Sequence, residues 1–163
     1  MTVFISYRHT DFSTAWEVNK KLNGAGIKTY LDKLDAESQT TEDITSVITR
    51  NILQSTHLIA VVSAQTAASW WVPFEIGEAT VTQRRITSFQ IGFSKLPEYL
   101  DKWPKMMTMK HVDLFIEEYQ SEHRTISASR YSINESSENA FVRNIKNADD
   151  FHRALKNKIS RGF

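Results

Sequence analysis

The most informative absence in this sequence is cysteine, which does not occur among its 163 residues. Without cysteine the chain has no disulfide framework, no cysteine nucleophile and no thiolate metal site, as is typical of proteins kept in a reducing compartment. Residues 1–5 show neither the basic n-region nor the long apolar h-region of a signal peptide, so we expect none, and no apolar run is long enough to span a bilayer. We therefore expect a cytoplasmic protein with no membrane partner.

The sequence also lacks an excess of positive or negative charge. The chain has 20 lysine and arginine residues against 19 aspartate and glutamate residues, and it has no block of like charge that could attract nucleic acid. The 5 histidines are scattered without the spacing of metal ligands, which predicts no metal site. Hydrophobic residues make up 40% of the chain, enough for one core, and we expect a single domain over residues 1–163.

Short apolar runs alternate with amphipathic stretches along the chain. Apolar runs predict strands, and apolar positions three or four residues apart predict helices. Strands are expected over 3–7, 27–31, 58–62 and 86–91, and helices over 12–22, from Thr40 or Thr41 onward, over about 69–83 and over about 148–160. The segment 93–147 is irregular, so there we expect a short strand near 106–109 and a helical stretch near 113–119. Residues 121–147 are expected to form a long loop with room for one short element.

This alternation predicts a flavodoxin-like, three-layer α/β fold. Its mostly parallel sheet should have about five strands in the order 2-1-3-4-5, with helices on both faces. In such sheets ligands bind outside the carboxyl ends of the strands, at the switch point between the first and third strands. Those ends correspond here to residues 6–9 and 63–71.

Several common functions of this architecture are excluded by missing motifs. No G-x-G-x-x-G follows the first strand, and the sequence has no G-x-x-x-x-G-K-[ST], no H-E-x-x-H and no G-x-S-x-G. A phospho-accepting receiver domain needs acidic residues after its first strand and an aspartate after its third. Residues 6–9 and 62–63 supply neither.

Trp71 and Glu75 are the most distinctive pair near the predicted ligand site. They are four residues apart on a helix that begins just after the third strand, so both side chains project from one face. Glu78 lies on that face too and is the alternative carboxylate. We interpret Arg84 and Arg85 as the basic end of this helix, where cations offset the helix dipole.

Four stretches in order resemble the Toll/interleukin-1 receptor (TIR) domain family, and above all its members that cleave NAD+. Residues 3–8 are similar to the first box of the family, and residues 26–32 to its second strand. Residues 33–39 stand where the family has its BB loop. Trp71-Val72-Pro73-Phe74-Glu75 matches the W-x-x-x-E pattern of the NAD-cleaving members. The resemblance covers residues 1 to about 92 and is weak beyond, except for the terminal helix.

The resemblance implies a TIR-type NAD+ glycohydrolase, cyclase or transferase, with NAD+ as its substrate and no cofactor. Cleavage between nicotinamide and ribose develops positive charge on the sugar, which an ionised carboxylate such as that of Glu75 can stabilise as the catalytic group. The indole of Trp71 can stack on nicotinamide. The other substrate-binding residues are expected to be Ser6, Tyr7, Arg8, Lys33, Leu34 and Asp35.

The resemblance also implies partners. Residues that correspond to Lys33, Leu34 and Asp35 gate or complete the site in NAD-cleaving members, often together with a neighbouring subunit, so self-association through TIR–TIR contacts is expected. Because the predicted domain fills the chain, it resembles the standalone prokaryotic members. Those make a nucleotide signal for a separate effector in antiphage defence of the Thoeris kind.

Other interpretations stay open at this point. A non-catalytic interaction module would use the same loop and helices to dock to another TIR domain. Trp71 could be a core residue, and Arg8 could form a structural ion pair with Asp11 or Asp32.

Overall fold

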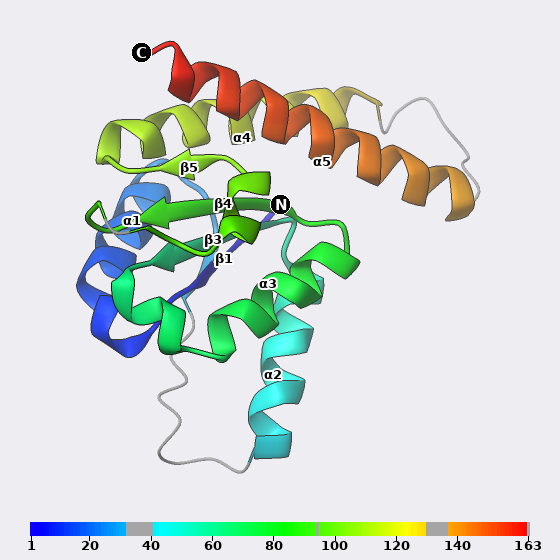
Figure 1. Ribbon diagram of the computed structural model, residues 1–163. Coiled ribbons are helices and arrows are strands. Elements are labelled where there is room, and N and C mark those ends of the chain that lie inside the picture. Colours follow the sequence, from blue (N-terminus) through cyan, green and yellow to red (C-terminus); the bar gives the residue numbers. More distant parts are fainter. Residues whose placement is uncertain (32–40, 94, 130–136, 163) are drawn as a thin grey trace.

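A five-stranded parallel sheet forms the centre of the computed structural model, which describes residues 1–31, 41–93, 95–129 and 137–162 (Figure 1). The strands are β1 (Val3–Ser6), β2 (Thr29–Leu31), β3 (His57–Val62), β4 (Arg85–Gln90) and β5 (Lys105–Met106). Their order in the sheet is β2-β1-β3-β4-β5, and every neighbouring pair is parallel. The predicted flavodoxin-like fold and strand order are therefore confirmed.

Helices cover both faces of this sheet. They are α1 (Phe12–Gly24), α2 (Thr41–Gln54), α3 (Trp71–Val81), α4 (Met109–Ser129) and α5 (Ser137–Ser160), with the short 3₁₀ helices η1 (His9–Asp11), η2 (Ala64–Ala68) and η3 (Glu98–Lys102). α4 and α5 lie above the sheet in Figure 1, and α2 and α3 lie below it. Among the described residues, no helix has the length and apolar composition needed to cross a membrane.

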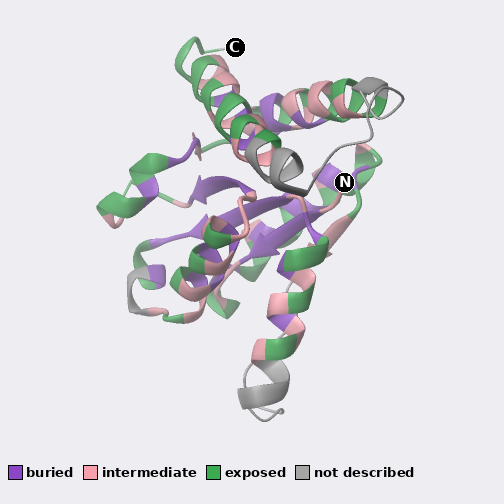
Figure 2. Ribbon diagram, turned by 90° about the vertical axis from the view of Figure 1, so that its right-hand side faces the viewer, coloured by how far each residue is buried: buried purple, intermediate pink, exposed green. Residues whose placement is uncertain are grey.

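The central strand β3 contributes side chains to the core on both faces of the sheet. All six of its residues are buried, as expected for a parallel strand with helices on both faces (Figure 2). Because side chains alternate along a strand, Ile59 and Val61 pack on the side of α1, α4 and α5, whereas Leu58 and Val62 pack on the side of α2 and α3.

The carboxyl-terminal third differs from the sequence prediction. The expected loop over 121–147 is wrong over 121–129 and 137–147, because α4 continues through Ser129 and α5 begins at Ser137 rather than near residue 148. Residues 130–136 of that expected loop lie outside the described residues. The expected strand near 106–109 is only the two residues of β5. The far ends of α4 and α5 extend beyond the sheet in Figure 1. The single-domain extent of 1–163 stays a prediction.

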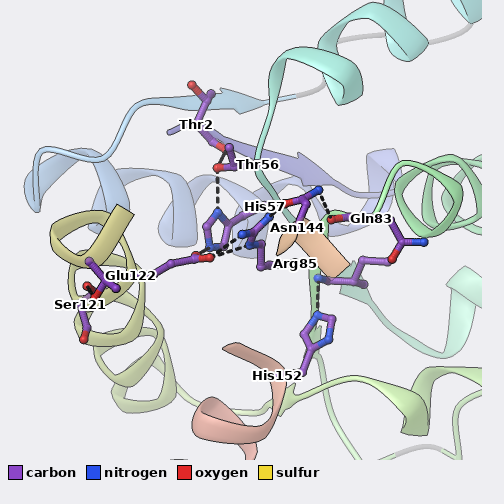
Figure 3. A network of polar contacts seen from close by, with 11 residues as sticks. Thr2, Thr56, His57, Gln83, Arg85, Ser121, Glu122, Asn144 and His152 are labelled. Carbon is purple, nitrogen blue, oxygen red and sulfur yellow. Dashed lines mark hydrogen bonds and ion pairs between the residues drawn. The ribbon is translucent and has the colours of Figure 1, made fainter. Parts of the chain in front are cut away.

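A buried polar network fastens α4 and α5 to the amino ends of the central strands (Figure 3). Arg85, the first residue of β4, is only 3% exposed, and its Nη2 lies 2.6 Å from Oε1 of Glu122 on α4. Its Nη1 donates to the Asn144 side chain on α5. His57, the first residue of β3, places Nε2 3.2 Å from Oε2 of Glu122. Arg85 is thus a buried strand residue, and its interpretation as the basic end of a helix is wrong.

The charges in this network follow from burial and hydrogen bonding. Burial lowers the pKa of His57, so its imidazole is neutral at neutral pH and presents its Nε2 proton to Glu122. Burial alone would raise the pKa of Glu122, but the hydrogen bond from His57 and the positive charge of Arg85 bring it below the usual value. The network therefore contains one cation and one anion held away from water.

The buried imidazole of His152 should make the protein less stable in mild acid. Its Nε2 accepts the main-chain N–H of Ile86 at 2.8 Å, which only the neutral ring can do. Burial lowers the pKa of His152 from 6.5 to about 4, although nearby Asp149 opposes the shift. The unfolded chain then binds more protons below pH 6.5, so the stabilisation is complete above that pH and is lost as pH falls toward 4. The free energy of unfolding should drop by roughly 3 kcal/mol through this group.

Urea denaturation at pH 7 and at pH 4.5 measures this effect. The variant His152→Gln should show a smaller drop between the two pH values than the unsubstituted protein. The control His123→Gln replaces an exposed histidine on α4 and should keep the full drop. An unchanged drop in His152→Gln would show that this imidazole does not cause the acid sensitivity.

Candidate functional site

The end of β1 and the helix α3 bring Ser6 and Glu75 together. Phe4 and Ser6 point toward the layer of α2 and α3, because alternate residues of β1 face the same side of the sheet. Glu75 lies on α3, is 1% exposed, and accepts a hydrogen bond from the Ser6 hydroxyl through Oε2. A carboxylate on α3, the helix that follows β3, thus reaches the carboxyl end of β1.

This position is the topological switch point of the sheet. The chain leaves β1 toward α1 on one face, and it leaves the neighbouring strand β3 toward α3 on the other. Diverging connections of this kind open a crevice at the carboxyl ends of the strands. A carboxylate there accepts hydrogen bonds from hydroxyl groups and stabilises a nearby positive charge.

Trp71 begins α3, one helical turn before Glu75. Its ring stacks on that of Trp70, with centroids 3.9 Å apart, and meets Phe74 edge to face at 5.9 Å. Trp71 is partly buried against the core under α2 and α3, whereas Trp70 is 60% exposed. The two indoles therefore combine a core contact with an exposed flat surface.

Arg8 joins the ends of β1 and β3. Its Nη1 donates a hydrogen bond to the main-chain oxygen of Gln65 in η2. Within the described part of the chain, Arg8 forms no ion pair with Asp11, so that alternative is wrong; Asp32 lies outside the described residues. The guanidinium group thus sits at the same edge of the sheet as the Ser6–Glu75 pair.

Tyr7 points away from Glu75. Its ring packs 5.9 Å from that of Phe12 and against the core on the α1 side of the sheet. The structure brings Ser6 and Glu75 into contact and places Arg8 nearby in the chain, but Tyr7 occupies the opposite face. The functional roles of all four residues stay predictions.

Comparison with known proteins identifies the family. The family model of the TIR domain matches residues 3–127. The chain belongs to the TIR domain family. No curated protein is significantly similar to this TIR domain in sequence.

Solved structures are similar to this TIR domain in fold, and two of them have a TM-score of 0.56. One is the TIR domain of the Toll-related receptor TRR-2 from Hydra magnipapillata, with 20% identity, a TM-score of 0.56, and coverage of 77% of this chain and 97% of that chain. The other is a 2-deoxyribosyltransferase from Bacillus psychrosaccharolyticus, with 8% identity, a TM-score of 0.56, and coverage of 69% and 90%. At these identities both likenesses concern the fold alone.

The loop residues predicted to complete the site of this TIR domain are Lys33, Leu34 and Asp35. They lie outside the described residues. Their substrate-binding and gating roles therefore stay predictions.

Sequence reasoning missed a buried carboxylate beside the site of the TIR domain. Asp11 is buried and accepts hydrogen bonds from the hydroxyls of Ser63 at 2.9 Å and Thr66 at 3.3 Å. Ser63 and Thr66 also form a capping box at the start of η2. The spacing Ser-x-x-Thr directly after a strand resembles a helix-capping pattern, and it is the feature of the sequence that could have indicated this cluster. This cluster ties η1 to η2 and so holds the loop that carries the Arg8 contact.

Glu78 does not share the position of Glu75. Its Oε1 accepts a hydrogen bond from the Thr49 hydroxyl on α2 at 2.8 Å. Glu78 therefore faces the neighbouring helix, and Glu75 is the carboxylate that meets β1.

Proposed function

We propose that this TIR domain cleaves NAD+ between nicotinamide and ribose. The observation that carries the proposal is the buried carboxylate of Glu75, held by Ser6 at the carboxyl end of β1. A buried charge is expensive to maintain in a fold, and perturbed or buried carboxylates in a crevice are typical of functional sites. The W-x-x-x-E spacing supports the same role.

The chemistry needs only one carboxylate. As the bond between ribose C1′ and the nicotinamide nitrogen breaks, both electrons go to that nitrogen, and the pyridinium leaves as neutral nicotinamide. The positive charge passes to the sugar, where Glu75 stabilises it and accepts hydrogen bonds from the ribose hydroxyls. A nucleophile then bonds to C1′. Water gives ADP-ribose, an atom of the same molecule gives a cyclic product, and an outside acceptor gives a conjugate.

Neighbouring side chains supply binding. The exposed face of the stacked pair Trp70–Trp71 offers a surface for the flat nicotinamide ring. Arg8 uses one N–H on Gln65, and a guanidinium has five, so donors are left for a diphosphate. Lys33, Leu34 and Asp35 would close the site, alone or with a second copy of the chain. The nucleotide product would act as a signal for a separate effector, as in antiphage systems of the Thoeris kind.

The purified protein incubated with NAD+ tests the proposal. Mass spectrometry should detect release of nicotinamide. The rate of release per protein molecule should rise with protein concentration or with a crowding agent, because assembly would complete the site. The second product, read in the same spectra, identifies the nucleophile. No release at any concentration would instead favour a non-catalytic interaction module. The exposed aromatic side chains Trp70 and Phe93 also fit such a module.

A further inference from the structure

A pocket of about 320 Å³ lies between the turn that joins α1 to β2 and the helix α4. Lys28 lines it just before the first residue of β2, and Tyr119 lines it from α4. The pocket is therefore at the amino ends of the strands, whereas Ser6 and Glu75 meet at the carboxyl end of β1.

The charged groups around this pocket are basic. Lys28 and Arg124 both line it, and neither side chain has a hydrogen bond or an ion pair with a described residue. His123 also lines the pocket and can donate a ring N–H. Its described lining includes no carboxylate. Positive charge that lacks a protein counterion in a concave surface attracts an anionic ligand.

The hydroxyl of Tyr119 is a further donor without a partner. Tyr119 is only 5% exposed, and its ring packs 4.8 Å from that of His57 in the core. Its hydroxyl has no hydrogen bond with the described residues, yet it is not among their side-chain atoms that are sealed from solvent. Burial raises the pKa of Tyr119 to about 12, so the phenol keeps its proton at neutral pH and can donate it to a ligand.

Apolar side chains complete the lining. Ile27 belongs to the buried core cluster that includes Leu22 and Phe115, and Ala25 packs against this cluster. Both residues line the pocket. The volume is at the lower end of that of small-molecule sites and larger than one phosphate group can fill. A ligand that fills it needs an uncharged body as well as an anionic group.

We propose that this pocket binds a small phosphate ester. Its phosphate accepts charge-assisted hydrogen bonds from Lys28 and Arg124 and a further bond from the Tyr119 hydroxyl, and its organic body covers Ala25 and Ile27. A phosphate is favoured over a carboxylate because it has three acceptor oxygens and close to two negative charges near neutral pH. The inference does not depend on NAD+ cleavage, which is assigned to the opposite edge of the sheet.

Titration of the ¹⁵N-labelled protein with phenyl phosphate tests the pocket. Phenol serves as the uncharged match, and inorganic phosphate serves as the anion without a body. Phenyl phosphate should shift the amide signals of Gly26, Lys28 and Gln120 in a saturable way and bind at least about tenfold more tightly than either match. Equal affinity for phenyl phosphate and either match, or saturable shifts that map elsewhere, would overturn the proposal.

Phosphate esters also occur as lipid headgroups, and a sedimentation assay with vesicles that contain phosphatidylinositol 4-phosphate separates the two sources. The protein should stay in the supernatant, because the proposed ligand is a free ester. Sedimentation with these vesicles, without binding of phenyl phosphate, would show that the cations contact a membrane surface and would contradict the proposal.

The variant Arg124→Gln should weaken the binding of phenyl phosphate about tenfold, and Tyr119→Phe should weaken it about threefold while keeping the ring in the core. The control Lys110→Gln removes an exposed cation near the start of α4 and should leave the affinity unchanged. Equal losses in Arg124→Gln and Lys110→Gln would show that net charge, not this pocket, attracts the ester. A thermal melt verifies that each variant folds, and the comparison of three ligands on the unsubstituted protein decides the question without any variant.

Discussion

Replacing Glu75 by glutamine should lower the rate of nicotinamide release by at least about 10²- to 10³-fold, the usual effect of removing one group that stabilises transition-state charge. Glutamine has the same shape, and its amide oxygen can still accept the hydrogen bond from Ser6. The substitution removes the negative charge and keeps the size of the side chain, so the fold should persist. Initial rates measured by mass spectrometry, with a thermal melt of the same sample, separate loss of catalysis from loss of folding.

The control for this substitution is Glu98→Gln, which removes an exposed carboxylate on η3 and should leave the rate unchanged. The informative comparison is with Glu78→Gln. If that variant lost turnover while Glu75→Gln retained it, the assignment of the catalytic carboxylate would be wrong.

Replacing Glu122 by alanine should destabilise the protein by about 3–5 kcal/mol, because it leaves a buried charge without its partner. The guanidinium of Arg85 would lose the carboxylate at 2.6 Å and keep only the Asn144 side chain as a described polar contact. His57 would lose the acceptor opposite its Nε2 as well. Urea denaturation at neutral pH measures the change as a lower transition midpoint.

The matched control is Glu117→Ala, on the same helix but exposed and 3.7 Å from Lys158, and it should change stability by less than about 1 kcal/mol. The double variant Arg85→Met with Glu122→Leu should recover much of the loss, since removing both charges also removes the cost of burying one alone. Similar effects of Glu122→Ala and Glu117→Ala would show that water reaches Arg85.

The fold was predictable where the core is built from local patterns. The continuous apolar runs of β1 and β3, and the stripe that includes Ile48 and Ile52 on α2, indicate buried strands and an amphipathic helix directly. Once strands alternate with helices, few topologies remain, and the order 2-1-3-4-5 follows from their connections.

The carboxyl-terminal helices and the buried network were not predictable in the same way. α4 follows β5 and α5 follows α4 with no strand between the two helices, so the alternation of strands and helices that guided the rest of the prediction gave no guide there. His57, Arg85 and Glu122 are far apart in the sequence, and no local spacing reveals that folding brings them together.

The candidate site lies between these cases. From the sequence, the predicted strand ends and switch point put Ser6 close to the start of α3. The spacing of four residues predicted that Glu75 and Trp71 share one face of that helix. The rotation of α3 about its axis decides which carboxylate meets β1, and that angle depends on packing against α2. The sequence alone therefore left Glu78 as an alternative to Glu75. In the structure Glu78 contacts Thr49 on α2, whereas Glu75 contacts Ser6 on β1.

The match to the TIR family ends at residue 127, but the folded unit does not. Phe151 and Leu155 of α5 are buried in the same cluster as Phe115 and Val61. A shortened protein designed to stop at the family boundary would expose this apolar surface to solvent and should tend to aggregate. Expression and fusion designs for this domain should therefore keep the last helix and attach tags after it.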